Sequence, residues 1–340
     1  MPPVRRRGED CLESGLAAWR AHEALAALAY SRAMSFPPYS PARPAEAHRV
    51  PVRGLSYHLE AWGGPELTTP DRPVLLCLHG WMDVGASFQF MVDALAALEG
   101  LQRWVVAPDW RGFGRSSAGG SDSYWFPDYV GDLDALIDHV SPSGPVDLLG
   151  HSMGGNVAMS YAGVRPERVR KLINLEGFGL PASKPQQAPK RLLQWLDELK
   201  APAVLRHYAS ADEVAARLIK TNPRLAPDKA AWLATRWAAP DPQGQWHLLA
   251  DAAHKHVNPA LYQAAEVVET WARITAPLLW VEGADTDVRK WWGERYPRGE
   301  FEARLARVAQ VERETLADCG HMLHHDQPSA LAARLLGFLG

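Results

Sequence analysis

Residues 147–156 read DLLGHSMGGN, and this stretch decides the fold of the chain. It places Ser152 on a sharp turn between an apolar run, residues 145–149, and a segment of small residues. Gly150 and Gly154 remove the Cβ atoms that would collide where a strand folds back against a helix, so the serine can take a strained backbone conformation and expose its Oγ. The N–H groups at the start of the following helix point at the same place and suit an oxyanion. The stretch therefore predicts a nucleophilic serine on a strand–turn–helix elbow.

Three further segments carry related signals in chain order. The first, residues 73–82 (PVLLCLHGWM), is a buried strand that runs into a His-Gly turn. There the backbone N–H of Trp81 can join that of Met153 in an oxyanion hole. The second, residues 104–116 (WVVAPDWRGFGRS), is a strand that ends in a glycine-rich loop, and the third, residues 316–322 (LADCGHM), places a histidine just past another strand.

With these motifs in this order, the chain resembles the α/β-hydrolase family over about residues 50–340. Residues 175–178 (LEGF) and the helical segment after them are similar to the serine hydrolase-like group within that family. The resemblance implies an α/β-hydrolase fold, in which a mainly parallel twisted sheet has helices on both faces and a helical cap inserted above it.

The hydrophobic pattern along the chain also predicts an α/β fold, because apolar strands alternate with amphipathic helices. Strands are expected near residues 50–62 (a hairpin), 73–79, 104–108, 146–150, 170–176, 277–282 and 312–317, with helices at 88–98, 128–139, 301–308 and 329–339. The region after the sixth strand is rich in tryptophan and reads as helical without a convincing strand. The family carries its cap there, above the ligand crevice. We therefore divide the chain into an N-terminal extension and Pro-rich linker (1–48), a core (49–177 and 273–340) and a helical cap (178–272).

The first 48 residues differ in character from the rest. Three arginines at 5–7 precede an apolar stretch at 16–30, as in a signal peptide, but charged residues interrupt that stretch and no small-residue cleavage site follows. We interpret the segment as a short amphipathic helix followed by a proline-rich linker.

The composition is that of a globular protein. A chain of 340 residues with 47% hydrophobic content can bury a sizeable core, and its net charge of −3 gives no reason to expect nucleic acid or a membrane surface as a partner. Cys11, Cys77 and Cys319 are an odd and sparse set, and Cys77 lies in a predicted buried strand, which favours reduced thiols in the cytoplasm; their spacing does not match a metal motif. We expect no cofactor and no metal, and the oligomeric state stays open.

His321 is the expected general base. It lies in the loop after the last strand, and the resemblance implies the chain order serine, acid, histidine. Its neutral ring suits transfer of the Ser152 proton near pH 7. His324 and His325 are expected on the following turn, facing away or lining the entrance, and His79 is expected to fix the oxyanion turn by hydrogen bonds.

The acid has more than one candidate. Most family members place an aspartate in the loop after the seventh strand, but residues 283–287 read GADTD here, so that Thr286 holds the usual place between Asp285 and Asp287. Glu176 ends the sixth strand, where a carboxylate orients the histidine in haloalkane dehalogenases. Sequence spacing leaves Glu176 and the loop aspartates open.

A serine at position 152 argues against chemistries that need an aspartate nucleophile. It favours attack on a carbonyl and an acyl-enzyme intermediate, with a small to medium, rather apolar carboxylic ester as the small-molecule substrate because the cap is rich in tryptophan. A lactone or thioester would use the same groups. The alternatives are hydrolysis of a C–C bond in a β-diketone-like compound, acyl transfer to another alcohol, and a non-catalytic small-molecule binder.

Overall fold

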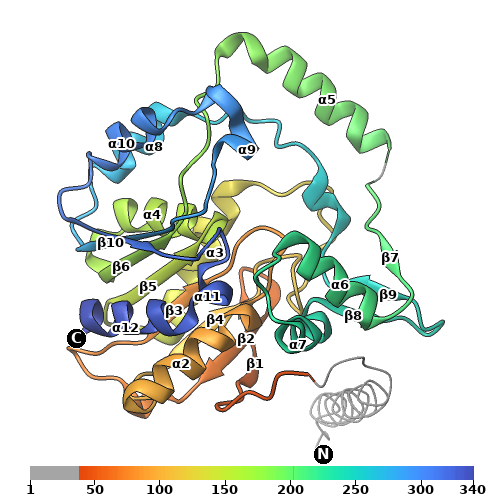
Figure 1. Ribbon diagram of the computed structural model, residues 1–340. Helices are drawn as coiled ribbons and strands as arrows, with labels where there is room; N and C mark the ends of the chain where they lie inside the picture. Colours follow the sequence, from red (N-terminus) through yellow and green to blue (C-terminus); the bar gives the residue numbers. More distant parts are fainter. Residues whose placement is uncertain (1–37, 202) are drawn as a thin grey trace, which may run out of the picture.

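The computed structural model describes residues 38–201 and 203–340, and its centre is an eight-stranded sheet (Figure 1). The strand order is β1-β2-β4-β3-β5-β6-β10-β11. The first two strands pair antiparallel with each other, β2 pairs antiparallel with β4, and the remaining pairs are parallel. The strands are β1 (Glu46–Val52), β2 (Leu55–Trp62), β3 (Leu75–Leu78), β4 (Val105–Pro108), β5 (Val146–His151), β6 (Val169–Leu175), β10 (Leu278–Gly283) and β11 (Val311–Leu316). The predicted hairpin and the mainly parallel sheet are confirmed.

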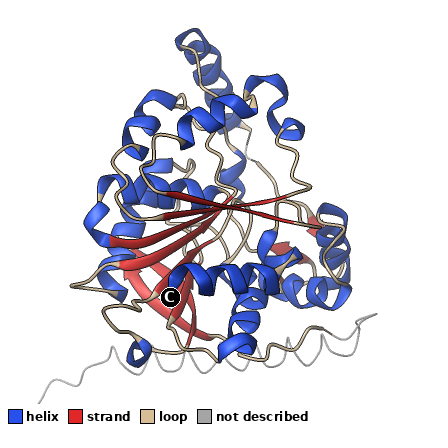
Figure 2. Ribbon diagram, turned by 60° about the vertical axis from the view of Figure 1, so that its left-hand side comes forward, coloured by secondary structure: helices blue, strands red, loops and turns tan. Residues whose placement is uncertain are grey.

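Helices cover both faces of this sheet, as Figure 2 shows. Along β3, Leu75 and Cys77 face one apolar cluster while Leu76 and Leu78 face the other, and all four side chains are fully buried. This two-sided burial explains why the central strands read as continuous apolar runs. One face is covered by α2 (Gln89–Glu99) and α12 (Pro328–Leu339), and the other by α3 (Phe126–Val140), α4 (Met153–Val164), α8 (Ala264–Trp271) and α10 (Arg298–Leu305).

Shorter helical elements complete the described fold. Two single turns, α9 (Arg289–Trp292) and α11 (Leu323–Asp326), lie near the carboxyl ends of the last strands. The 3-10 helices are η1 (Pro65–Leu67), η2 (Gly85–Phe88), η3 (Pro166–Arg168), η4 (Pro185–Gln187), η5 (Ala252–Lys255) and η6 (Gly293–Arg295). No helix in residues 38–201 or 203–340 is long and apolar enough to span a membrane.

The N-terminal boundary differs slightly from the expected one, because β1 begins at Glu46 and takes up the last residues of the proposed extension. Residues 38–45 pack against the core. The hydroxyl of Tyr39 donates to Asp93 at 2.7 Å, and the backbone N–H groups of Ala42 and Arg43 donate to the same carboxylate. The predicted amphipathic helix lies outside the described residues.

The region between β6 and β10 corresponds to the proposed cap and contains α5 (Ala188–Lys200), β7 (His207–Tyr208), α6 (Ala211–Thr221), α7 (Pro227–Trp237), β8 (Ala238–Pro240) and β9 (Trp246–Leu248), followed by α8. The expectation of no strand there is wrong, since β7, β9 and β8 form a small antiparallel sheet. Strands of two or three residues are too short for alternation to reveal in a sequence. Helices α6 and α7 share a separate apolar cluster, whereas α5 has no buried residue and stands at the top of Figure 1.

This region is joined to the core at the glycine-rich loop after β4. The N–H of Gly114 donates to Leu249 at 2.6 Å, and the N–H of Asp251 donates to Gly112 at 2.7 Å. His254 then stacks on the ring of Phe113 from the core, with centroids 3.7 Å apart. Tyr124 stacks on the same imidazole at 3.6 Å. The junction therefore depends on an imidazole enclosed between aromatic rings.

This junction predicts a loss of stability in acid. Burial lowers the pKa of His254 from 6.5 to about 4, because the enclosed ring disfavours the charged form. The unfolded chain therefore binds this proton more tightly, so the free energy of unfolding is intact above about pH 6.5 and decreases toward pH 4, by about 3 kcal/mol in full. We expect Tm to fall less between about pH 6.5 and pH 4 in the His254→Gln variant than in the unmodified chain, with both proteins measured side by side. Equal pH profiles for the two proteins would contradict this assignment.

Candidate active site

Ser152 occupies the predicted strand–turn–helix elbow between β5 and α4. Its backbone has φ 52° and ψ −113°, a strained conformation for a residue other than glycine. A Cβ on Gly150 would lie 2.3 Å from the carbonyl oxygen of Gly154, so this approach of strand and helix needs glycine. The N–H of Ser152 donates to Leu175 at 2.8 Å, which fastens the elbow to the end of β6.

His321 lies beside a buried carboxylate, that of Glu176. The imidazole Nδ1 is 2.6 Å from Glu176 Oε2, and the second carboxylate oxygen accepts the N–H of Gly283 at 2.7 Å. The glutamate side chain has no exposed surface, whereas that of the histidine is 26% exposed. An ionised carboxylate can only accept, so Nδ1 carries the proton and Nε2 keeps its lone pair for a reacting group.

The sequence leaves Glu176, Asp285 and Asp287 open as the acid, and the two loop aspartates are engaged elsewhere. Asp285 extends outward, where its Oδ2 lies 2.6 Å from the guanidinium of Arg224 and its side chain is 47% exposed. Asp287 is also exposed and accepts a hydrogen bond within its own turn. Of the three candidates, the structure brings only Glu176 to His321.

The turn after β3 lies directly against the elbow. His79 accepts the N–H of Trp110 through Nε2 at 2.9 Å, so its Nδ1 donates to the carbonyl of Gly80 at 2.7 Å. Burial lowers the pKa of this ring, which favours the neutral form that these bonds require. A Cβ on Gly80 would lie 3.3 Å from that of Ser152. The backbone that carries Trp81 is thus adjacent to the first residues of α4, and His79 holds the turn as expected.

Two tryptophans on the segments around the site are partly exposed. Trp81 is 53% exposed on the turn after β3. Trp291, on α9, is 42% exposed and meets the ring of His321 edge to face, with centroids 4.6 Å apart. The sequence motifs indicate a role only for the backbone of Trp81 and none for Trp291, since nothing local to α9 indicates a neighbour 30 positions along the chain.

His324 and His325 lie on the following turn, as expected, but of the two alternatives for their side chains the one that lines the entrance is wrong. Both lie on α11 and are buried, with 0% and 4% of their surface exposed. Within the described residues, His324 belongs to the one group whose composition and spacing suit a metal ion, together with Asp83 and His151. The sequence pattern indicates no role for Asp83 or His151.

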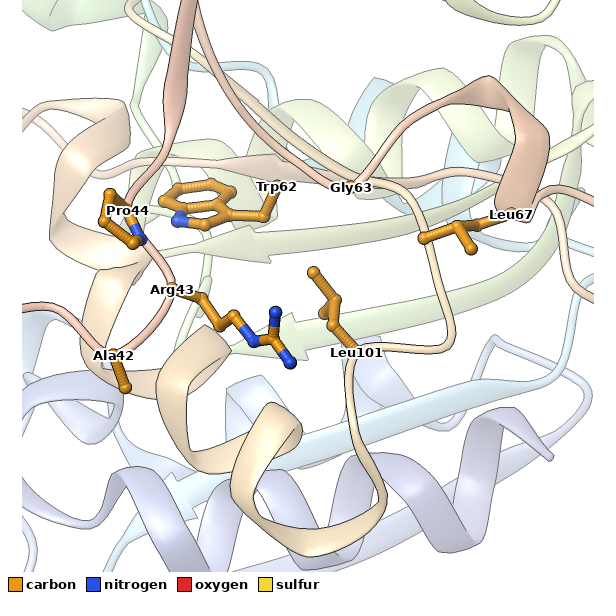
Figure 3. Close-up of a pocket in the computed structure, with 7 residues that line it drawn as sticks. All are labelled: Ala42, Arg43, Pro44, Trp62, Gly63, Leu67 and Leu101. Carbon is orange, nitrogen blue, oxygen red and sulfur yellow. The ribbon is translucent and has the colours of Figure 1, made fainter.

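A separate hollow lies away from the candidate catalytic side chains (Figure 3). It has a volume of about 360 Å³ and sits between the docked N-terminal segment and the end of β2. Its lining residues are Ala42, Arg43, Pro44, Trp62, Gly63, Leu67 and Leu101. The hollow therefore does not contain the elbow serine, the histidine or its carboxylate.

The sequence profile described as the alpha/beta hydrolase fold matches residues 73–328, and the chain belongs to this family. It is similar to a serine hydrolase-like protein of Danio rerio, with 34% identity over 139 residues, which are 40% of this chain and 39% of that protein. That match supports the resemblance to the serine hydrolase-like group, although it spans well under half of the zebrafish protein.

Longer matches connect the chain with other hydrolases. A 3-hydroxybutyrate-oligomer hydrolase of Cupriavidus necator is 29% identical over 309 residues, which cover 87% of this chain and 95% of that protein. An epoxide hydrolase of Caballeronia sordidicola is 26% identical over 318 residues, covering 85% and 92%. The solved thioesterase domain from the curacin biosynthetic pathway has a TM-score of 0.71 and 29% identity, covering 86% of this chain and 99% of that domain. These neighbours support hydrolase activity.

Proposed function

We propose that this protein is a serine hydrolase that cleaves small to medium, rather apolar carboxylic esters through an acyl-enzyme intermediate. The observation that carries the proposal is the 2.6 Å contact between His321 Nδ1 and the buried Glu176, beside a serine on a strained elbow. A buried carboxylate that fixes the tautomer of an exposed imidazole is the arrangement that prepares a histidine to act as a base.

The proposed reaction begins when Ser152 Oγ attacks the ester carbonyl and His321 Nε2 accepts the serine proton. The backbone N–H groups of Trp81 and Met153 stabilise the oxyanion of the tetrahedral intermediate. The imidazolium then gives its proton to the departing alcohol, which leaves the acyl group on the serine. Water activated by the same imidazole releases the acid. Throughout both steps, Glu176 stabilises the positive charge that develops on the ring.

The serine itself favours acyl chemistry over opening of an epoxide. A carboxylate that attacks an epoxide forms an ester, which water can hydrolyse to free the enzyme. Attack by Ser152 Oγ would instead form an ether, which neither His321 nor an oxyanion hole would help to cleave. The similarity to an epoxide hydrolase thus supports the shared fold and hydrolase class rather than that substrate.

The surroundings of the site favour an apolar substrate. Trp291, whose ring meets that of His321, and Trp81, on the turn next to the elbow, both have partly exposed indole rings. Such rings bind alkyl or aryl groups by removing them from water. A thioester or lactone would be attacked by the same groups. C–C bond hydrolysis, acyl transfer and pure ligand binding stay as alternatives that the test must separate.

The test combines an active-site probe with a substrate series. A fluorophosphonate reacts with activated serine nucleophiles, so we expect it to label the folded protein at Ser152 and to block ester hydrolysis in proportion to labelling. A series of p-nitrophenyl esters of increasing acyl length then gives kcat/KM for each chain length. Absence of labelling and turnover in folded protein would favour the ligand-binding alternative. Labelling without release of acid from any ester would favour acyl transfer or C–C hydrolysis.

A further inference from the structure

A second polar cluster lies in the interior, behind the proposed catalytic residues. Asp83, His151 and His324 are 3%, 2% and 0% exposed, and one potential ligand atom from each lies within 4.8 Å of the others. Asp83 Oδ2, His151 Nδ1 and both ring nitrogens of His324 are buried without a hydrogen-bond partner. Buried polar atoms without partners are rare in folded proteins because desolvation is costly, so this concentration needs an explanation.

The remaining polar atoms of two of these residues are held from outside the cluster. His151 Nε2 donates to the carbonyl of His321 at 2.8 Å, which leaves the lone pair of Nδ1 directed at the cluster. Asp83 Oδ1 accepts the N–H of Val84 at 2.8 Å and the hydroxyl of Ser87. Metal-binding histidines and carboxylates are oriented in this way, with the outer atom fixed by a hydrogen bond and the inner atom free.

We propose that Asp83, His151 and His324 form a buried binding site for a divalent transition metal ion of the Zn²⁺ type. Two imidazoles and one carboxylate are a ligand set that suits this ion. Asp83 Oδ2 and His324 Nε2 are 3.8 Å apart. In a tetrahedral zinc site with bonds of about 2.0–2.1 Å, neighbouring ligand atoms are about 3.4 Å apart, so side-chain shifts of about 1 Å or less bring the three protein ligands to that spacing, and a water would supply the fourth ligand.

A proton shared between Asp83 and His324 accounts for the cluster less well. Their separation of 3.8 Å is longer than a hydrogen bond. A proton there would also leave Nδ1 of His151 without a partner, whereas a single ion uses the inward-facing atoms of all three residues.

The position of the site gives the ion a structural role. Asp83 follows the turn that carries Trp81, His151 immediately precedes Ser152, and His324 lies in α11, the turn of helix after His321. One ion would therefore join the three loops that carry the proposed oxyanion donors, nucleophile and base, from the side away from the substrate. It is a positioning element that touches no substrate, and its presence does not depend on which bond the enzyme cleaves.

Metal analysis of the folded full-length chain, without an affinity tag, tests this proposal. The protein is produced in Zn²⁺-supplemented medium, passed through a desalting column with a chelator, and analysed by mass spectrometry for metals. We expect about one zinc ion per chain. We expect less than about a tenth of an ion per chain in His324→Gln and Asp83→Asn, because loss of an outer-shell partner alone weakens metal binding by about 10- to 100-fold and loss of a ligand weakens it further. His325→Gln is the matched control, a buried histidine on the same helix outside the group, and should keep the ion.

If circular dichroism shows that the variants do not fold, a second measurement on the unmodified protein still tests the proposal. Unmodified protein refolded with Co²⁺ should show the intense visible absorption bands of a tetrahedral site, and refolding with Zn²⁺ should raise Tm by several degrees. The proposal is overturned if the unmodified chain holds no zinc after both production and refolding. It is equally overturned if folded His324→Gln keeps the ion, or if His325→Gln loses it while His324→Gln does not.

Discussion

Replacing Ser152 by alanine is expected to lower kcat for p-nitrophenyl ester hydrolysis by about 10⁴- to 10⁶-fold, with Tm almost unchanged. Alanine keeps the Cβ at the φ of 52° that the elbow already accommodates, so the substitution removes only the Oγ. Without that oxygen no acyl-enzyme forms, and only substrate binding and the oxyanion donors contribute to the rate. Steady-state kinetics and fluorophosphonate labelling of the same preparation measure the effect.

Ser160→Ala supplies the matched control for this substitution. Ser160 lies on the same helix and its hydroxyl donates to the carbonyl of Asn156 at 2.9 Å, away from the elbow. Its loss should leave both turnover and labelling near those of the unmodified protein. Undiminished turnover by Ser152→Ala, in a preparation that the fluorophosphonate does not label, would reject Ser152 as the nucleophile.

The core of the fold could be predicted because its signals are local. Each central strand is buried on both faces, so it reads as an apolar run such as residues 75–78 regardless of what lies elsewhere in the chain. The elbow is equally local, since the glycines that its geometry requires lie within two residues of Ser152. Both features follow from the interactions of a short segment.

The acid could not be chosen from the sequence, because the choice depends on packing between distant segments. β6 and β10 are neighbours in the sheet, so both Glu176 and Asp285 follow strands that end near the histidine loop. Asp285 is engaged by Arg224, which comes from the region between the two strands. No spacing within the sequence reports that ion pair.

The buried cluster escaped prediction for a similar reason. Asp83, His151 and His324 come from three separate loops, and each alone is an ordinary polar residue next to a motif. Polar side chains are usually exposed, so nothing in the sequence pattern indicated that His324 would be fully buried. Only the assembled loops bring the three inward-facing atoms together.

Replacing Glu176 by glutamine is expected to lower kcat by about 10⁴-fold, whereas Asp285→Asn should change it by less than about threefold. Asp285 loses only an exposed ion pair, which contributes little in water. The two variants have the same change in charge and atom count. Comparing their kcat values therefore distinguishes the loss of a carboxylate beside His321 from a general electrostatic effect. Each kcat is measured with an ester at saturation, and circular dichroism confirms that both proteins fold.

The size of the effect at Glu176 follows from the two hydrogen bonds that its carboxylate accepts. The N–H of Gly283 points at Oε1 and requires an acceptor, so the amide oxygen of a glutamine takes that position. The amide NH₂ group then faces His321 Nδ1, which can remain there only as an acceptor. The ring proton moves to Nε2, where the lone pair needed for the Ser152 proton is lost. A severe defect in Asp285→Asn together with a mild one in Glu176→Gln would show that the histidine is oriented from the loop after β10 instead.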